Sequence, residues 1–371
     1  MSIVSKRISW WEPQIGEEEK ALILEVLDSN FLNDGEYTTR FEKMLADTLG
    51  CKHAVAVTNG TTALFLALIG SGVCPGDEVI VPDVTFIATA NAVVLAGAKP
   101  VLVDIDHKTL SIAPQKIEQA ITSNTKAIIP VHVSGRPADM VSILSIAAKH
   151  KLIVIEDAAE ALSSKLNGQY LGTFGQAGII SFSPNKTITT GQGGVILLND
   201  DTLEVRLREL KDQGRPLRGT GGEDTHNTIG YNFKLTNLQA AIGIAQLSTL
   251  SARVARMKLN YLQYLDNLQD IEELSFLPFN IEKGEVPQWV DVLSPRRNEL
   301  IEFLEEKNII CKKFWFPLHR NKPYLLPDEN FPNSTRLSAN AFWLPSCFSI
   351  TDADLDLVCK QIREFFGKTK V

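Results

Sequence analysis

The chain has 371 residues, of which 44% are hydrophobic and 22% charged, the composition of an ordinary globular protein. A formal net charge of -7 gives no electrostatic basis for binding nucleic acid or an anionic membrane. The sequence has no apolar run near the roughly 20 residues that span a bilayer, no secretory signal, and five cysteines without metal-ligand spacing, so we expect a cytoplasmic protein with reduced thiols.

Short β-branched runs alternate with helical patterns from about residue 54 to residue 198. The strand-like runs are 54–57, 78–81, 100–103, 127–131 and 152–155, and the clearest helical patterns are 63–69, 88–95 and 140–150. This alternation predicts an α/β fold with a doubly wound, mostly parallel sheet covered by helices on both faces.

The second half of the chain has a different pattern. A charged helical stretch runs from 237 to about 270, a loop-like segment follows at 280–287, and helical patterns return at 297–306 and 352–366. We therefore predict a large domain over residues 1–245, and a linking helix with a small α+β domain over residues 246–371.

Lys186 lies between a hydroxyl-rich segment and the glycine-rich Gly191-Gln192-Gly193-Gly194. Most lysines are solvated surface charges, but a lysine in a suitable environment is a nucleophile that forms a Schiff base with an aldehyde. If the aldehyde belongs to pyridoxal phosphate, the chain must also supply a phosphate cradle, a carboxylate for the ring nitrogen and a surface for the ring.

Two segments at expected strand ends could supply the cradle and the carboxylate. Gly60 and Thr61 follow a strand and open a helix, where free N–H groups favour phosphate, although simple helix capping explains the same residues. Asp157 follows the strand at 152–155, where ligands bind in open α/β sheets, and capping is again the alternative. Glu160 lies three residues later and would share the same helical face.

Phe86 and Ser181 complete the candidate set. Phe86 follows a strand and could stack on a cofactor ring, although most phenylalanines belong to the core. Ser181 lies five residues before the lysine and could donate a hydrogen bond to phosphate.

Taken together and in this order, these segments resemble the DegT/DnrJ/EryC1/StrS family of sugar aminotransferases, pyridoxal-phosphate enzymes of the aspartate aminotransferase fold (fold type I). The resemblance covers nearly the whole chain. It rests on the segments 59–64, 75–82, 130–132, 156–161 and 230–241 and on the segment around Lys186.

The resemblance implies a role for each matching residue. Lys186 would bind the cofactor as a Schiff base and carry the proton between cofactor and sugar, and Asp157 would pair with the pyridinium nitrogen. Phe86 would stack on the ring, and Glu160 would contact the cofactor or the substrate. The remaining residues would bind the phosphate or the substrate: Gly60, Thr61 and Ser181 the phosphate, Asn232 the phosphate of a partner subunit's cofactor, and His319 the substrate. For His319, a surface or loop position is the alternative.

The chain also departs from the common pattern of the family. Glu160 stands where many members have Gln or His. The branch that makes nucleotide-linked 4-amino sugars resembles this chain in having Glu at that position. Ser134 and Arg136 replace a common Tyr and Gln, so the contacts beside the pocket are expected to differ. A dehydratase branch has His in place of the lysine, and Lys186 argues against that chemistry.

The resemblance implies a homodimeric aminotransferase that acts on a nucleotide-linked 4-keto-6-deoxy sugar with L-glutamate as amino donor and pyridoxal phosphate as cofactor. A 3-keto sugar or cyclitol aminotransferase is an alternative, and so is a non-catalytic or regulatory ligand-binding module. Four arginines could contact a pyrophosphate or be solvated surface charges: Arg215, Arg218, Arg253 and Arg256.

Overall fold

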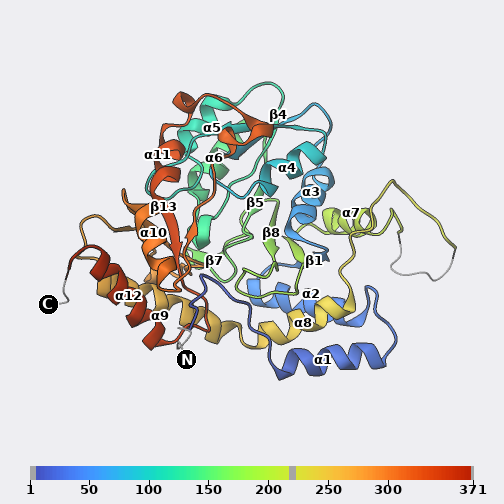
Figure 1. The fold of residues 1–371 in the computed structure, drawn as a ribbon. Coiled ribbons are helices and arrows are strands. Elements are labelled where there is room, and N and C mark those ends of the chain that lie inside the picture. Colours follow the sequence, from blue (N-terminus) through green and yellow to red (C-terminus); the bar gives the residue numbers. More distant parts are fainter. Residues whose placement is uncertain (1–5, 217–222, 369–371) are drawn as a thin grey trace.

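The computed structural model describes residues 6–216 and 223–368. Helices cover both faces of a central sheet, and a smaller sheet with its own helices lies beside them (Figure 1). None of the helices in these two ranges has both the length and the apolar character of a membrane span.

The central sheet has seven strands in the order β1-β9-β8-β5-β4-β2-β3. β9 runs antiparallel to both of its neighbours, whereas the pairs from β8 to β3 are parallel. The predicted α/β fold with a mostly parallel sheet is therefore confirmed. The strands are β1 (His53–Val57), β2 (Glu78–Pro82), β3 (Lys99–Val103), β4 (Thr125–Ile128), β5 (Ile153–Asp157), β8 (Ala177–Ser181) and β9 (Gly194–Leu198).

Successive side chains of these strands enter different hydrophobic clusters, as the period of two requires. In β1, Val55 and Val57 pack in the cluster formed with α3, α4 and α7, while Ala54 and Ala56 pack in the cluster formed with α2 and α8. A third cluster joins the other end of the sheet to α5 and α6. These helices are α2 (Glu36–Leu49), α3 (Gly60–Gly70), α4 (Ala88–Leu95), α5 (Pro114–Ala120), α6 (Met140–His150), α7 (Asp201–Lys211) and α8 (Asn237–Ser248), and α1 (Glu17–Asp28) packs on α8.

The smaller sheet is antiparallel, in the order β10-β11-β13-β12. Its strands are β10 (Ser275–Phe276), β11 (Val290–Leu293), β12 (Lys312–Lys313) and β13 (Ala341–Leu344), and its helices are α9 (Leu250–Leu268), α10 (Arg297–Glu306), α11 (Pro332–Asn340) and α12 (Asp352–Phe365). Trp11 and Val131 join the same hydrophobic core, so the two parts of the molecule share one packed interface. A short hairpin, β6 (Lys165–Leu166) with β7 (Gln169–Tyr170), completes the strands.

The predicted helical stretch from 237 to 270 is two helices. α8 ends at Ser248 and α9 begins at Leu250, because Thr249 leaves helical geometry at φ -99° and ψ 2°. The predicted domain border after residue 245 falls inside α8, and the domain assignment stays a prediction.

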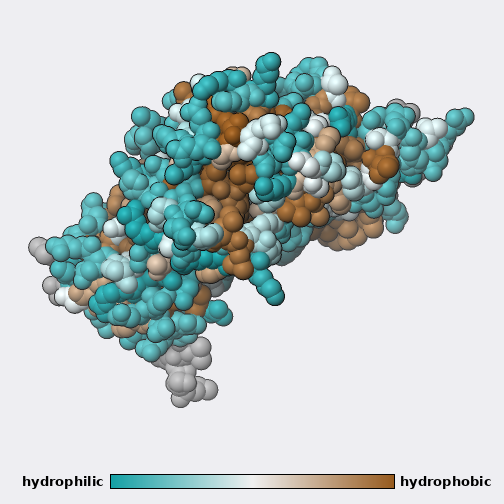
Figure 2. Space-filling view, turned by 90° about the horizontal axis from the view of Figure 1, so that it is seen from above, coloured by the Kyte–Doolittle hydropathy of each residue, from teal (hydrophilic) through white to brown (hydrophobic). Residues whose placement is uncertain are grey.

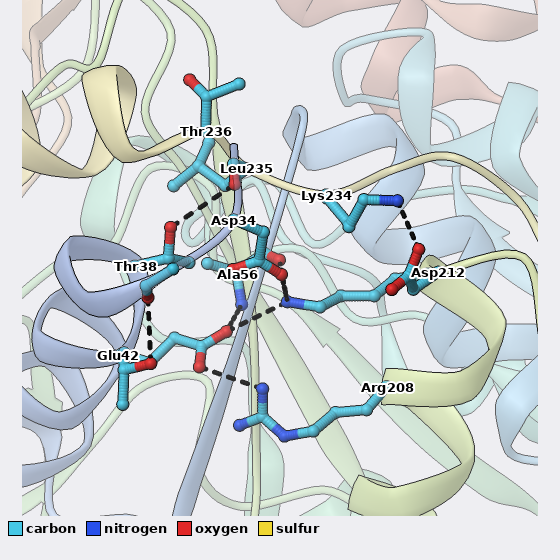
Figure 3. Close-up of polar contacts among 12 residues, drawn as sticks. Asp34, Thr38, Glu42, Ala56, Arg208, Asp212, Lys234, Leu235 and Thr236 are labelled. Atoms are coloured by element: carbon cyan, nitrogen blue, oxygen red, sulfur yellow. Dashed lines mark hydrogen bonds and ion pairs between the residues drawn. The ribbon is translucent and has the colours of Figure 1, made fainter. Parts of the chain in front are cut away.

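A group of charged residues, buried except for the partly exposed Arg208, ties α2 and α7 to β1. Lys211 lies 3.3 Å from the carboxylate of Asp34 and 3.2 Å from that of Glu42, and it also donates to the carbonyl of Ala56 at 3.0 Å. The guanidinium of Arg208 donates to the second oxygen of Glu42 at 3.0 Å (Figure 3). We call Asp34, Glu42, Arg208 and Lys211 the Lys211 cluster.

Candidate active site

A cavity of about 700 Å³ lies between the two parts of the molecule. The large sheet contributes Asp157 at the end of β5 and Ser181 at the end of β8, and the smaller sheet contributes Trp343 of β13. Carboxyl ends of parallel strands form the usual ligand site of open α/β sheets. Of the predicted site residues, seven line this cavity: Gly60, Thr61, Phe86, Asp157, Glu160, Ser181 and Lys186.

The N-terminus of α3 forms one wall. Asn59 caps the helix by accepting a hydrogen bond from the backbone N–H of Thr62 at 2.9 Å. Gly60 lies so close to β8 that a Cβ there would be 3.1 Å from the Cβ of Ser181. The first N–H groups of a helix lack partners within the helix and attract anions. Capping and a phosphate cradle are thus compatible at this site, with the Ser181 hydroxyl as a further donor.

Asp157 is a buried carboxylate that faces the cavity, with 6% of its surface exposed. Burial raises the pKa of Asp157, opposed by a hydrogen bond from the Thr89 hydroxyl at 2.7 Å and by the N–H of Ala159. A cationic group in the cavity would favour the ionised form. This carboxylate therefore fits a protonated ring nitrogen.

A second layer of buried polar groups holds β5 behind Asp157. His132 accepts a hydrogen bond from the N–H of Ala138 at Nδ1, so its proton is on Nε2, which donates to Glu156 at 2.9 Å. Glu156 also accepts three backbone N–H groups, from residues 172, 174 and 175. Both side chains are fully buried and fully paired, which makes the end of β5 a rigid support.

The ammonium of Lys186 lies 3.1 Å from Glu160 and 4.9 Å from the ring centroid of Trp289. The other oxygen of Glu160 accepts the backbone N–H of Ser134 at 3.1 Å. Burial raises the pKa of Glu160 to about 7, opposed mainly by the Lys186 charge. Glu160 lies in a turn rather than in the helix we predicted, yet it shares the cavity with Asp157 as expected.

Ser134 connects Glu160 to the smaller sheet. Its backbone is left-handed, with φ 53°, and its hydroxyl donates to Asp291 of β11 at 2.9 Å. Asp291 also accepts the indole N–H of Trp343 and pairs with Arg136 at 2.6 Å. The two unusual residues of the sequence, Ser134 and Arg136, therefore meet at one buried carboxylate.

The sequence did not point to five residues of the site. Trp289 and the β12 residues Lys312 and Lys313 line the cavity. Thr89 and Asp291 lie behind it and hold Asp157 and Ser134. Thr89 lies three residues after Phe86, so its position at the start of α4 was a usable signal. Trp289 and the β12 lysines come from the smaller sheet, and no local pattern relates them to β5.

Two predicted residues lie outside the cavity. Asn232 is exposed. His319 is fully buried, with its ring nitrogens 2.6 Å from Asp83 and 3.0 Å from Asp328. The structure thus brings neither into contact with Lys186 within one chain.

The candidate pyrophosphate arginines are bound elsewhere. Arg215 pairs with Asp224, Arg253 donates to the carbonyls of Thr187 and Gln14, and Arg256 pairs with Asp352. The alternative was a solvated surface charge, but Arg253 is buried, and Arg215 and Arg256 are only partly exposed and are paired with carboxylates. Arg218 lies outside the described residues.

Comparison with known proteins agrees with this geometry. The profile of the DegT/DnrJ/EryC1/StrS aminotransferase family matches residues 13–363. The chain is 38% identical to GDP-perosamine synthase of Caulobacter vibrioides, covering 95% of this chain and 96% of the relative. It is 37% identical to GDP-perosamine synthase of Escherichia coli O157:H7, covering 98% and 99%. Among solved structures, DesV of S. venezuelae, in complex with a ketimine intermediate, has a TM-score of 0.90 at 31% identity, covering 95% of both chains.

Proposed function

The chain belongs to the DegT/DnrJ/EryC1/StrS aminotransferase family, and from this premise we propose that it converts a nucleotide-linked 4-keto-6-deoxy sugar to the 4-amino sugar. L-glutamate is the amino donor, and pyridoxal phosphate is the cofactor. The observation that carries the proposal is the pairing of Lys186 with Glu160 in a cavity that also holds Asp157. Two relatives named GDP-perosamine synthase support the nucleotide-linked sugar and favour GDP as the nucleotide.

The residues around the cavity fit pyridoxal phosphate. Gly60, Thr61 and Ser181 would hold the phosphate, Phe86 would cover the ring, and Asp157 would hold the proton on the ring nitrogen. Phe86 is 58% exposed although it is a large aromatic, so it has a free face for a ring. When bound, this cofactor supplies an aldehyde for the amino group and a ring that accepts electrons.

Lys186 and Glu160 would transfer the proton that the reaction moves to the sugar carbon. With a pKa of about 7, the Glu160 carboxyl can hold or release a proton near neutral pH, and the Ser134 N–H fixes its orientation. Lys186 Nζ, beside it and over the Trp289 ring, would hold the cofactor through its aldehyde group and would return the proton to the sugar carbon.

We also propose a homodimer with shared active sites. Tyr231 and Phe233 stack on each other, with ring centroids 5.2 Å apart, and Tyr231 packs on Phe65, so Asn232 between them is left on the outside. Two large apolar side chains are strongly exposed: Ile229, three residues before Asn232, is 86% exposed, and Leu95 at the end of α4 is 62% exposed. Figure 2 shows apolar residues gathered across the middle of one face, with hydrophilic residues around them. Exposed apolar surface of this kind is typical of a subunit interface. Asn232 would then reach the partner subunit's cofactor.

An amination screen tests the function. Holoenzyme is incubated with L-glutamate and with 4-keto and 3-keto sugars on GDP, dTDP or UDP, and NMR gives the position of the new amino group. We expect a 4-amino product, and we expect glutamate alone to bleach the visible absorption of the enzyme. A 3-amino product would replace the proposed regiochemistry. Cofactor binding without amination of any sugar would favour a ligand-binding module.

A further inference from the structure

Lys312 and Lys313 are adjacent residues of β12, and both line the cavity that contains Lys186. Their backbone is fixed, because β12 pairs with β13 through Lys312 with Trp343 and Lys313 with Phe342. Both residues are exposed, so the cavity opens to solvent beside two positive charges. We infer that this pair of lysines binds the diphosphate of the nucleotide-linked substrate, an inference that rests on the proposed function.

The first argument is the lack of a competing partner. Across residues 6–216 and 223–368, neither ammonium forms an ion pair with a carboxylate within 4.0 Å. The arginines considered for this role contrast with the lysines, because Arg215 and Arg256 are paired with Asp224 and Asp352. An anion that enters the cavity therefore meets the lysine charges without displacing another group.

The second argument is the ordering of Lys312. Its ammonium lies 4.5 Å from the ring centroid of Trp10, and Trp10 stacks on Trp343 at 5.8 Å. An ammonium held over an aromatic face is restrained without an oxygen acceptor, so the N–H groups that point away from the ring can donate to an anion. This restraint lowers the entropy that binding would otherwise cost.

The third argument is charge. Burial and the charge of Lys186 lower the pKa of Lys312, whereas the charge of Glu160 raises it. Lys312 therefore lies within electrostatic reach of the reactive amine. Three lysines line one cavity with two carboxylates, Asp157 and Glu160. The cofactor phosphate is expected on the large-sheet side, at α3, which leaves the smaller-sheet side for the diphosphate.

The binding experiment uses holoenzyme and three variants: Lys312→Gln, Lys313→Gln and the double variant. Inorganic pyrophosphate and the diphosphates GDP, dTDP and UDP are the probes, with Kd measured by calorimetry at two salt concentrations. We expect each substitution to raise the Kd of pyrophosphate and of the preferred nucleotide about tenfold, the loss of one charged hydrogen bond. The double variant should also show a weaker dependence on salt.

Lys307→Gln is the matched control. Lys307 is exposed and also lies over an aromatic ring, that of Phe303 at 5.3 Å, but it does not line the cavity. The Lys307→Gln variant loses the same charge as Lys312→Gln, but outside the cavity. Its Kd values should therefore equal those of the wild type. Lys312→Arg should retain most of the affinity, because a guanidinium also binds phosphate.

The amino donor is the competing source of an anion. Stopped-flow bleaching by L-glutamate measures that half-reaction separately from the sugar nucleotide. If the double variant lost as much apparent affinity for glutamate as for pyrophosphate, the lysines would bind the donor carboxylates. That result would overturn the inference. Unchanged Kd values for all four diphosphate probes in the double variant would overturn it too. Wild-type enzyme that binds these probes but aminates no keto sugar would instead refute the proposed function.

Discussion

Two lysines in this molecule lie close to buried carboxylates, and their surroundings differ. Lys211 donates hydrogen bonds to Glu42 and to the carbonyl of Ala56, the Asp34 carboxylate lies 3.3 Å away as an ion-pair partner, and 3% of its side chain is exposed. Lys186 has one carboxylate, Glu160, and its amine lies at a cavity of about 700 Å³. Three oxygens therefore surround the ammonium of Lys211, whereas one carboxylate oxygen lies beside the ammonium of Lys186.

The difference separates a structural lysine from a reactive one. Both lysines are next to a buried carboxylate and have little exposed side chain, 11% for Lys186 and 3% for Lys211. Neither property therefore identifies the nucleophile. Free volume and unused hydrogen-bonding capacity do, because a substrate must reach the amine and the amine must be able to leave its partner. Each of the following experiments tests one side of this comparison.

The largest effect is expected at Lys186. Lys186→Ala should lower amination by roughly 10⁴-fold or more, as loss of a nucleophile does in other enzymes. Lys186→Arg should be as inactive while keeping the charge beside Glu160, because a guanidinium is not deprotonated in proteins. Steady-state kinetics on purified variants, with circular dichroism as the folding control, give the answer. Activity in Lys186→Arg would mean that charge, not nucleophilicity, is what the site needs.

At Lys211 the expected loss is in stability. Lys211→Met leaves the Asp34 and Glu42 carboxylates buried and without this partner, which should cost about 3–5 kcal/mol of unfolding free energy. The urea midpoint of the variant should fall accordingly, and its kcat should change little in protein that remains folded. A variant with wild-type stability but lost amination would contradict the division of roles between the two lysines.

Glu160 gives the reactive site its own pH dependence. Its pKa is about 7 in the folded chain, against an ordinary value of 4.5. Between these two values the folded state binds more protons than the unfolded state, so stability decreases as the pH rises through this window. The slope contributed by one group is at most about 1.4 kcal/mol per pH unit.

Urea midpoints of cofactor-free protein at pH 5, 6, 7 and 8 measure this slope. Glu160→Gln should flatten it between pH 5 and 8, and the slope that remains comes from other carboxyl groups, among them Asp157 and Asp83, whose pKa values burial also raises. Equal slopes in the wild type and in Glu160→Gln would show that the carboxyl titrates normally despite its burial.

Much of the fold could be predicted from the sequence, because its signals are local. Alternating runs at 78–81, 100–103 and 152–155 correspond to β2, β3 and β5 within one or two residues. The break at Thr249 could not be predicted in this way, because α8 packs against α1 and α2 whereas α9 packs against α12. Tertiary contacts, not propensity, divide that stretch.

The site was predictable where it lies on the ends of the large-sheet strands. Asp157, Ser181 and Gly60 each follow or end a strand, and such ends converge in an open sheet. The contacts of Glu160 with Ser134, and of Ser134 with Asp291, join positions separated by 26 and 157 residues, and sequence spacing carries no signal for them. The assignment of Asn232 concerns a second subunit and stays a prediction. The assignment of His319 to the substrate also stays a prediction, although its ring is buried against Asp83 in this chain.

The smallest loss of stability is expected at an exposed lysine, Lys43, which serves as the reference for the buried Lys211. Lys43 pairs with Asp47 at 2.8 Å on the surface of α2, with side chains 75% and 65% exposed. Lys43→Met is the same substitution as Lys211→Met, but exposed pairs of this spacing contribute only about 0.3–0.5 kcal/mol. Its urea midpoint should therefore lie close to that of the wild type, and the small difference should vanish in high salt, which screens exposed charges. A loss at Lys43 as large as the loss at Lys211 would mean that methionine itself destabilises these helices, and the role of the Lys211 cluster would have to be measured with Glu42→Gln instead.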